Sequence, residues 1–366
     1  MTCMSENGVG ARVVDADAHV NEAILDWTWL HERRPGWLTA ATSGGATVAG
    51  IDGRAYPLQE GPGRGVPVAS AIHPACRSGA GDVDQRIVDM DAEGIDVQVL
   101  YGGLSIGITG YDDAGLAADV ARQYNDWLLS SVCASYPDRL VGVCAVPLQD
   151  VDRAVAELTR VAALGAKAVT IPPVVGARNL DDPALDDFFA AVVDHDLAVG
   201  VHSAPGMHLP LPAADRFANY AQVHLLSFPV DQMVAFTALA LGGVFDRHER
   251  LRVAFLEAGV GWLAYFADRA HEHFEKRPEL LPAMRSTPRE LIERGQVWVS
   301  FECEDPLLSV YVERYGPDSV LFASDYPHWD AEWPGCVPAA RHLAAPLGPE
   351  AVTKLMGTNA TRFYRL

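Results

Sequence analysis

Two carboxylates and one imidazole alternate near the start of the chain, within the run Val13-Val14-Asp15-Ala16-Asp17-Ala18-His19. If this run is a β-strand, the two-residue period of a strand places Asp15, Asp17 and His19 on one face. Carboxylate and imidazole groups that share a face can bind one divalent metal ion. The chain therefore begins with what would be half of a metal site, and the remaining ligands must come from later in the sequence.

The elements that could bring such ligands together are eight short apolar runs, which predict β-strands at residues 13–14, 97–100, 140–143, 168–171, 197–201, 251–256, 297–301 and 320–323. Helix-like segments lie between them, at 84–93, 114–136, 150–164, 184–196, 230–245, 262–276, 307–315 and 350–356. Because strand and helix alternate, we expect an α/β fold with a parallel sheet. Eight apolar strands, each followed by a helix, favour a closed (β/α)8 TIM barrel over an open doubly wound sheet. Residues 1–366 are predicted to form this single domain.

Two segments are longer than ordinary barrel loops. Residues 26–81 follow the first predicted strand and are rich in Gly, Pro and Trp, and residues 203–228 follow the fifth. Long loops inside a compact domain are usually lids or binding loops. Barrel active sites lie at the carboxyl ends of the strands, so we expect both insertions to be lids over that mouth.

Ligand-type residues stand at the carboxyl ends of four predicted strands. Asp17 and His19 end the first strand, His202 ends the fifth, Glu257 the sixth and Asp325 the eighth. These ends meet at one mouth of a barrel, so residues far apart in sequence would come together there. The pattern predicts a metal centre built from imidazoles and carboxylates.

Six motifs support a more specific interpretation, and they span residues 14–19, 90–96, 137–142, 201–203, 324–328 and 359–364. Together they resemble the amidohydrolase superfamily, specifically the amidohydrolase 2 branch that holds aminocarboxymuconate-semialdehyde decarboxylase and the resorcylate decarboxylases. The resemblance implies metal ligands at Asp17 and His19, in place of the usual His-x-His pair, and at His202. It also implies that Asp325 is both a ligand and a proton-transfer group. Zinc, manganese and iron(II) all accept such ligands.

The sixth strand departs from this family pattern, because Glu257 stands where relatives usually carry a histidine. Glu257 could act as a base, or it could help to bind a second metal ion with His224 as its nitrogen partner. The expected metal content is therefore one ion, or two ions, per chain. The superfamily's carbamylated lysine has no counterpart, since Lys167 lies at the opposite end of the fourth strand.

Two enzymatic functions are open, and hydrolysis is the preferred interpretation because a carboxylate on the sixth strand suits water activation. An activated water would cleave a carbonyl–heteroatom bond of an amide, ester, lactone or thioester, with Asp325 or Glu257 as the base and His328 or Asp325 protonating the leaving group. The alternative is a non-oxidative decarboxylase of an aromatic or unsaturated carboxylic acid, in which Asp325 delivers a proton to carbon. A non-catalytic barrel is the third hypothesis.

Charge and composition narrow the expected partners. A formal net charge of −20 argues against nucleic acid or an anionic membrane as a partner. The chain has no apolar run of about 18 residues and no secretion signal at its start. Its six cysteines lie far apart without a Cys-x-x-Cys pair, as expected of reduced thiols. We expect a cytoplasmic enzyme that acts on a small molecule and, by resemblance, forms a homodimer.

Overall fold

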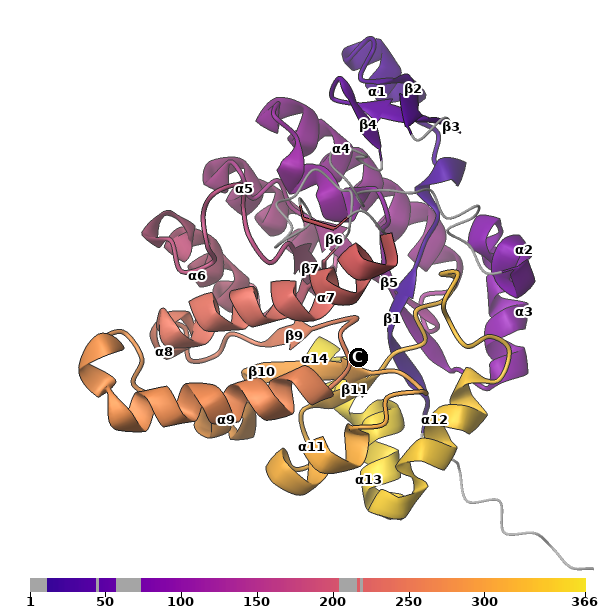
Figure 1. Cartoon of the computed structure of the whole chain (residues 1–366). Helices are drawn as coiled ribbons and strands as arrows, with labels where there is room; N and C mark the ends of the chain where they lie inside the picture. Colours follow the sequence, from indigo (N-terminus) through magenta and orange to yellow (C-terminus); the bar gives the residue numbers. More distant parts are fainter. Residues whose placement is uncertain (1–11, 44–45, 57–73, 204–215, 218–219) are drawn as a thin grey trace, which may run out of the picture.

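The computed structural model describes residues 12–43, 46–56, 74–203, 216–217 and 220–366. Eight parallel strands form one sheet, in the order β1-β5-β6-β7-β8-β9-β10-β11 (Figure 1). Their bounds are Val14–His19, Val97–Tyr101, Leu140–Ala145, Ala168–Ile171, Ala198–Val201, Val253–Phe255, Val297–Phe301 and Val320–Phe322. All eight predicted strands are confirmed.

The sheet curves until its first and last strands meet. No strand ladder joins β1 to β11 in the described sheet. The seam is instead closed just beyond β11, where the Asp325 amide donates to the Asp17 carbonyl at 3.0 Å and the His19 amide donates to the Tyr326 carbonyl at 2.5 Å. The predicted (β/α)8 TIM barrel is therefore confirmed.

Helices surround the barrel, and the longer ones are α3 Val83–Glu93, α4 Ala114–Trp127, α5 Val151–Ala163, α6 Asp186–Asp194, α7 Tyr220–Phe236, α9 Gly261–Lys276, α11 Leu308–Tyr315 and α12 Cys336–Ala344 (Figure 1). Shorter helices are α1 Thr28–Arg33, α2 Arg77–Gly81, α8 Val244–Arg247, α10 Pro288–Glu293, α13 Pro349–Thr353 and α14 Asn359–Tyr364. Asp82, Asp113 and Asp150 start α3, α4 and α5, because their carboxylates accept the first free backbone N–H groups. Buried apolar side chains fill the layer between helices and strands.

The interior of the barrel is a packed core rather than a channel. Tyr101 and Trp298 belong to it, together with Phe363 and Tyr364 from α14 at the end of the chain. The Tyr364 hydroxyl donates to the Ala16 carbonyl at 2.9 Å and lies 2.9 Å from the Tyr101 hydroxyl. Because α14 packs into the amino-terminal end of the barrel, the barrel interior is filled there, and an active site is expected at the carboxyl ends of the strands.

Strand β1 does not hold its three polar residues on one face, and that prediction is wrong. A β-bulge interrupts its pairing with β5 between Asp15 and Ala18. The extra residue of a bulge reverses the alternation of side chains. Asp15 consequently turns to the helix side, where it accepts hydrogen bonds from Gln98 Nε2 at 3.0 Å and the Ser324 amide at 2.9 Å. Only Asp17 and His19 face the mouth.

The two predicted insertions contain regular structure. Within 26–81, a three-stranded antiparallel sheet is formed by β2 Leu38–Ser43, β3 Ala46–Ile51 and β4 Arg54–Tyr56. Residues 57–73 lie outside the described part. Residues 204–215 of the second insertion also lie outside the described part. The rest of this insertion is helical from Tyr220, because α7 begins ten residues before the predicted start at 230 and continues through Pro229. Proline disfavours helix interiors, which explains the misplaced boundary. The lid role stays a prediction.

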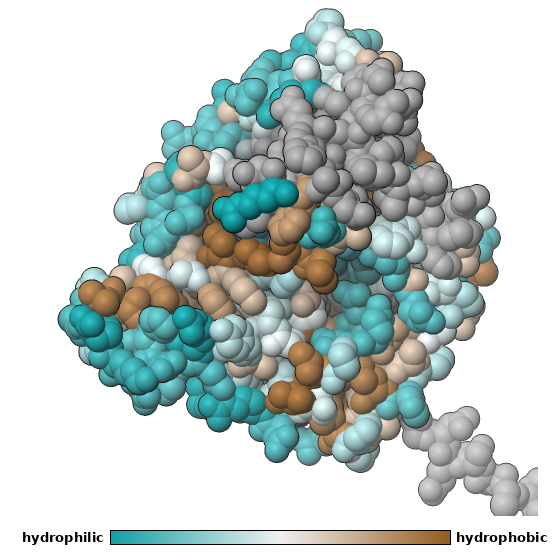
Figure 2. All heavy atoms as spheres, in the orientation of Figure 1, coloured by the Kyte–Doolittle hydropathy of each residue, from teal (hydrophilic) through white to brown (hydrophobic). Residues whose placement is uncertain are grey.

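Residues 221–241 are long and apolar enough, by length and composition alone, to cross a membrane, with a mean hydropathy of 1.3. Of the most apolar window, 56% is buried inside the protein. A barrel helix that packs on the strands needs such a composition. Figure 2 shows an apolar patch over α7, where Leu225 is 75% exposed, and a polar outer surface over α9.

Candidate metal centre

Four predicted ligands converge at the mouth of the barrel. His19 Nε2 lies 3.5 Å from Asp17 Oδ1 and 3.3 Å from Asp325 Oδ1. His202 Nε2 lies 3.7 Å from Asp17 Oδ2. All four residues are buried, with Asp325 the most accessible at 5%. The strand ends thus bring together residues from the first, fifth and eighth barrel strands, as the sequence predicts.

Backbone carbonyls fix the orientation of both imidazoles. His19 Nδ1 lies 3.2 Å from the Gly102 carbonyl, and His202 Nδ1 lies 2.7 Å from the Ser203 carbonyl. An Nδ1–H that donates to a carbonyl leaves the Nε2 lone pair free. Each ring therefore presents Nε2 to the centre, which is the arrangement that metal-binding histidines require.

The unsatisfied atoms of this cluster indicate what it binds. Asp17 Oδ1, His19 Nε2, His202 Nε2 and Asp325 Oδ1 are buried and make no hydrogen bond of good geometry in the described structure, although His328 Nδ1 lies against Asp325 Oδ1 and Glu257 Oε2 against His202 Nε2. Buried polar atoms are normally paired, and each unpaired one needs an explanation. Two overlapping ligand groups, Asp17-His19-His202 and His19-Asp325-His328, could hold a metal ion. A divalent metal ion would satisfy all four atoms at once, so the residues present fit this cofactor.

Burial and mutual repulsion set the protonation of the ligands. Burial, together with the nearby His19, lowers the pKa of His202 to about 3. Burial likewise lowers the pKa of His19. For Asp325, burial acts to raise the pKa, but the His328 charge and the close contacts of the carboxylate with His19 and His328 outweigh burial and lower the pKa. Neutral imidazoles and an ionised carboxylate are the forms that bind metal.

His328 pairs with Asp325 on the solvent side of the cluster. Its Nδ1 lies 2.7 Å from Asp325 Oδ1, and its ring stacks on that of His19 at 4.1 Å between centroids. Burial acts to lower the pKa of His328, but the Asp325 carboxylate outweighs it and raises the pKa. The His328 side chain is 27% exposed, so it is placed to carry a proton between solvent and the centre.

Glu257 contacts the cluster through His202, with Oε2 3.0 Å from His202 Nε2. Burial, then the charges of Asp325 and Asp17, raise the pKa of Glu257. Glu257 and Asp325 share a left-handed backbone, with φ of 55° and 54°. This conformation is costly for residues other than glycine and concentrates at functional sites.

His224 lies above this cluster on α7. Its Nε2 is 3.9 Å from Asp330 Oδ2, and its ring packs against Phe228 at 5.0 Å and Trp329 at 5.9 Å. Among the residues that the structure describes, neither possible ligand group includes His224. A second ion held by Glu257 and His224 therefore stays a prediction.

Sequence reasoning missed Glu302, which follows β10 directly. The two-residue alternation of β10 could have pointed to Glu302. Trp298 and Ser300 face the barrel interior, and Glu302 is the next residue in that series. Its neighbour Cys303 packs with the outer core, and Cys303 Sγ lies 3.0 Å from Glu304 Oε2. Burial and the Glu304 hydrogen bond raise the pKa of the Cys303 thiol, as expected of a packing cysteine.

The residue whose carbonyl faces His19 must be a glycine, Gly102, because the surrounding side chains leave no room for a Cβ atom. A Cβ at this position would collide with Ser105 Oγ and Glu22 Oε1, and Glu22 holds the same turn by accepting the Gly103 and Ser105 amides at 2.9 and 3.0 Å. We expect Gly102→Ala to displace the carbonyl that orients His19. Loss of such support typically weakens metal binding about 10–100-fold.

Titration calorimetry with Mn²⁺ would measure this loss. Gly81→Ala in α2 is the matched control, because its Cβ would meet only Ile24 Cγ2 at 3.7 Å. Equal affinities for the two variants would show that the Gly102 carbonyl does not position His19.

Asp231 supports the other histidine indirectly, because Ser203 Oγ donates to the Asp231 carboxylate and the Ser203 carbonyl faces His202. Burial raises the pKa of Asp231 to about 7, against ~3.9 in an unfolded chain. The folded state thus retains a proton that the unfolded state loses, and this group's contribution to stability falls as the pH rises from ~4 to ~7.

Asp231→Asn removes that dependence, because the amide cannot ionise. The variant should gain stability relative to the wild type at pH 8, on the order of 4 kcal/mol, and little at pH 4. Urea unfolding of both proteins at the two pH values would measure it. Asp194→Asn, at a carboxylate that is 79% exposed, is the control. A difference that is the same at both pH values would contradict the prediction.

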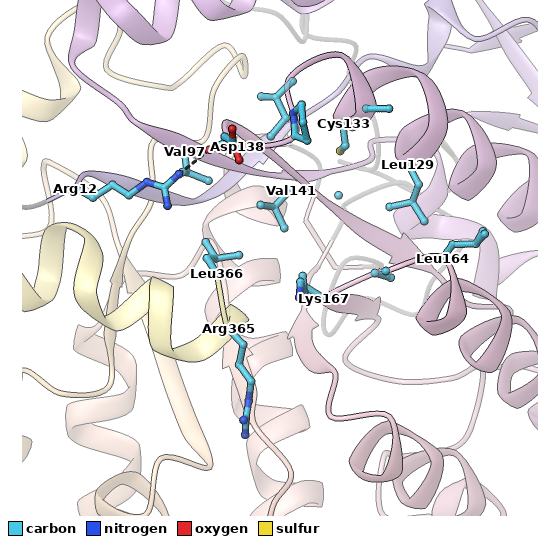
Figure 3. A pocket seen from close by; sticks show the side chains of 16 residues that line it. Arg12, Val97, Leu129, Cys133, Asp138, Val141, Leu164, Lys167, Arg365 and Leu366 are labelled. Carbon is cyan, nitrogen blue, oxygen red and sulfur yellow. Dashed lines mark hydrogen bonds between the residues drawn. The ribbon is translucent and has the colours of Figure 1, made fainter.

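The opposite end of the barrel carries a cleft of about 410 Å³, lined by Lys167, Arg12, Arg365 and Leu366 among others (Figure 3). Lys167 is exposed there, before β7 begins. Lys167 therefore lies at the end of the barrel away from the predicted metal centre.

An eight-stranded parallel barrel with a buried histidine and carboxylate metal centre at the carboxyl ends of its strands defines a metal-dependent (β/α)8-barrel enzyme. The family model described as Amidohydrolase matches residues 14–366. The chain belongs to this family, as its motifs predict.

The chain is also similar to individual enzymes of known reaction. The chain is 29% identical to 2-amino-3-carboxymuconate-6-semialdehyde decarboxylase of Dictyostelium discoideum over 67% of each chain. It is 27% identical to gamma-resorcylate decarboxylase of Rhizobium sp. (strain MTP-10005) over 77% of this chain and 87% of the relative. A manganese-bound 5-carboxyvanillate decarboxylase of Novosphingobium aromaticivorans DSM 12444 shares the fold, with a TM-score of 0.72, 22% identity and 98% of each chain covered.

These comparisons correct the preferred interpretation of the sequence, because the curated relatives are decarboxylases and the hydrolase prediction is wrong. The physical reason lies in Glu257, which seemed suited to activate water. Its burial and the neighbouring carboxylates raise the pKa of Glu257, and a raised pKa suits a proton donor as well as a base, so a glutamate at this position does not by itself select hydrolysis.

Proposed function

We propose that the protein is a metal-dependent, non-oxidative decarboxylase of an aromatic or unsaturated carboxylic acid. The observation that carries the proposal is the Asp325–His328 pair, with 2.7 Å between Oδ1 and Nδ1, at the open side of the ligand cluster. The decarboxylase relatives support the same reaction. A proton donor beside a site that binds carboxylates is what decarboxylation needs, since the carbon that loses carbon dioxide must gain a proton.

Asp17, His19, His202 and Asp325 would hold the metal ion. When bound, the ion would act as a Lewis acid that orients the substrate carboxylate and a neighbouring oxygen and withdraws electron density from the reacting carbon. We propose manganese, which a structurally similar decarboxylase binds, and one ion per chain, because the two possible ligand groups share His19.

The residues of the chain would move the proton. Asp325 holds His328 Nδ1 in place, and the pair would deliver a proton to the carbon that carries the carboxylate. The bond from this carbon to the carboxylate breaks, its electron pair stays on the carbon and forms the new C–H bond, and carbon dioxide leaves. The exposed part of the His328 ring would regain a proton from solvent. Asp17, His19 and His202 are buried, so solvent reaches the centre from the His328 side.

The test uses manganese-loaded protein with gamma-resorcylate, 5-carboxyvanillate and 2-amino-3-carboxymuconate-6-semialdehyde. We expect carbon dioxide from at least one acid and, in heavy water, one deuterium at the vacated carbon. Metal analysis should give one manganese per chain. If the loaded protein releases no carbon dioxide from these acids, the proposal is wrong.

A further inference from the structure

The last helix of the chain sends one hydroxyl group into the barrel interior. Tyr364, on α14, is 1% exposed, and its ring packs among the interior side chains. Its hydroxyl donates to the Ala16 carbonyl at 2.9 Å and lies 2.9 Å from the Tyr101 hydroxyl. A phenol has a single hydrogen to donate, and Tyr364 gives it to the carbonyl, so Tyr101 is the donor between the two hydroxyls. The Tyr364 hydroxyl therefore joins β1 to the side chain of Tyr101.

On β1, this hydroxyl binds at the bulge. The pairing of β1 with β5 shifts between Asp15 and Ala18, so the described ladder pairs neither Ala16 nor Asp17 with a residue of β5. The Ala16 carbonyl accepts from Tyr364, and the Asp17 carbonyl accepts from the backbone amide across the seam at 3.0 Å. The bulge determines which way Asp17 points. Tyr364 thus holds the backbone directly before a metal ligand.

The Tyr101 side chain packs beside the other ligands. Its ring centroid lies 5.6 Å from that of His202 and 6.2 Å from that of His19. Gly200 leaves room for this ring, because a Cβ atom there would collide with the Tyr101 hydroxyl. Tyr101 is fully buried and donates to Tyr364, so the ring is held against the interior side of both imidazoles.

We propose that Tyr364 is a positioning residue of the metal centre. Its hydroxyl fixes the bulge that carries Asp17 and the aromatic ring that packs beside both ligand histidines. The inference rests on the metal ion of the proposed function, but not on the reaction that the ion supports. Groups that orient metal ligands typically change the metal affinity about 10–100-fold when they are removed. Tyr364 acts through other residues, so we expect an effect at the lower end of this range.

The experiment measures metal binding rather than turnover. Tyr364→Phe removes the hydroxyl and keeps the ring, and titration calorimetry with Mn²⁺ should show an affinity about tenfold lower than that of the wild type. The EPR spectrum of the bound ion should change as well, because the zero-field splitting of Mn²⁺ depends on the arrangement of its ligands. Tyr101→Phe breaks the same contact from the other side and should also lower the affinity.

Tyr311→Phe is the matched control. Tyr311, on α11, is fully buried, and its hydroxyl lies 2.9 Å from Ser319 Oγ just before β11. This change removes a buried hydrogen bond of the same length at the other end of the barrel. Tyr311→Phe and Tyr364→Phe should lose comparable stability in urea unfolding, but only Tyr364→Phe should lose Mn²⁺ affinity and alter the EPR spectrum.

Wild-type Mn²⁺ affinity in Tyr364→Phe, or an equal loss of affinity in Tyr311→Phe, would overturn the inference. Should Tyr364→Phe fail to fold, Tyr101→Phe decides, and wild-type affinity in that variant would overturn the inference too. If the affinities change as expected but the wild-type protein releases no carbon dioxide, the proposed function alone is wrong.

Discussion

Asp325→Asn should reduce decarboxylation by roughly a thousandfold or more, since it removes a metal ligand and the partner of His328 in one change. The backbone should tolerate the substitution, because asparagine adopts the left-handed conformation that Asp325 occupies at φ 54°. Loss of activity would therefore report chemistry rather than unfolding.

Initial rates at saturating manganese, with the metal content and the thermal midpoint measured alongside, would establish the cause. Asp318→Asn is the control, because Asp318 lies at the other end of β11, pairs with Lys354 at 3.0 Å and is 57% exposed. If Asp325→Asn kept more than a tenth of the wild-type rate with manganese bound, Asp325 would not be the proton-transfer group.

Arg86→Met should destabilise the fold by about 2–6 kcal/mol, because it leaves two buried acceptors without a donor, at ~1–3 kcal/mol each. Arg86 is 2% exposed; it donates to Gln98 Oε1 at 3.0 Å and to the His19 carbonyl, and its guanidinium lies 4.6 Å from the Tyr326 ring centroid. Methionine fills similar space but leaves the His19 carbonyl and Gln98 without their donor. The effect should therefore appear in both stability and metal affinity.

Urea unfolding would measure the loss of stability, and calorimetry with Mn²⁺ the loss of affinity. Arg122→Met on α4 is the control, because Arg122 is exposed and surface changes usually stay within about 0.5 kcal/mol. Equal unfolding free energies for Arg86→Met and the wild type would show that the network beneath β1 does not stabilise the barrel.

The fold was predictable because each strand is a short apolar run with its own pattern. Residues 97–100 and 297–301 need only local information to be recognised as buried strands, and the alternation with helices then limits the topology. The ligand set was predictable for the same reason, since polar residues at strand ends converge in any barrel. The boundary of α7 and the bulge in β1 depend on tertiary packing, and they were mispredicted.

The reaction was harder to predict than the site. A carboxylate at the sixth strand end suggests a base, and burial beside Asp17 and Asp325 raises the pKa of Glu257, which suits a base or a proton donor and does not select between the two reactions. The homodimer and the cytoplasmic location stay predictions, which sedimentation and cell fractionation would test.

The seam between β1 and β11 has a consequence for the assembly of the protein. Asp17 and His19 stand on one side of it and Asp325 on the other, almost a whole chain length apart. A bound ion would act as a non-covalent cross-link between the two ends of the polypeptide, and cross-links that close long loops restrict the unfolded chain most. In a protein divided between β5 and β11, neither fragment would hold a complete ligand set, so tight metal binding would appear only after the halves reassociate.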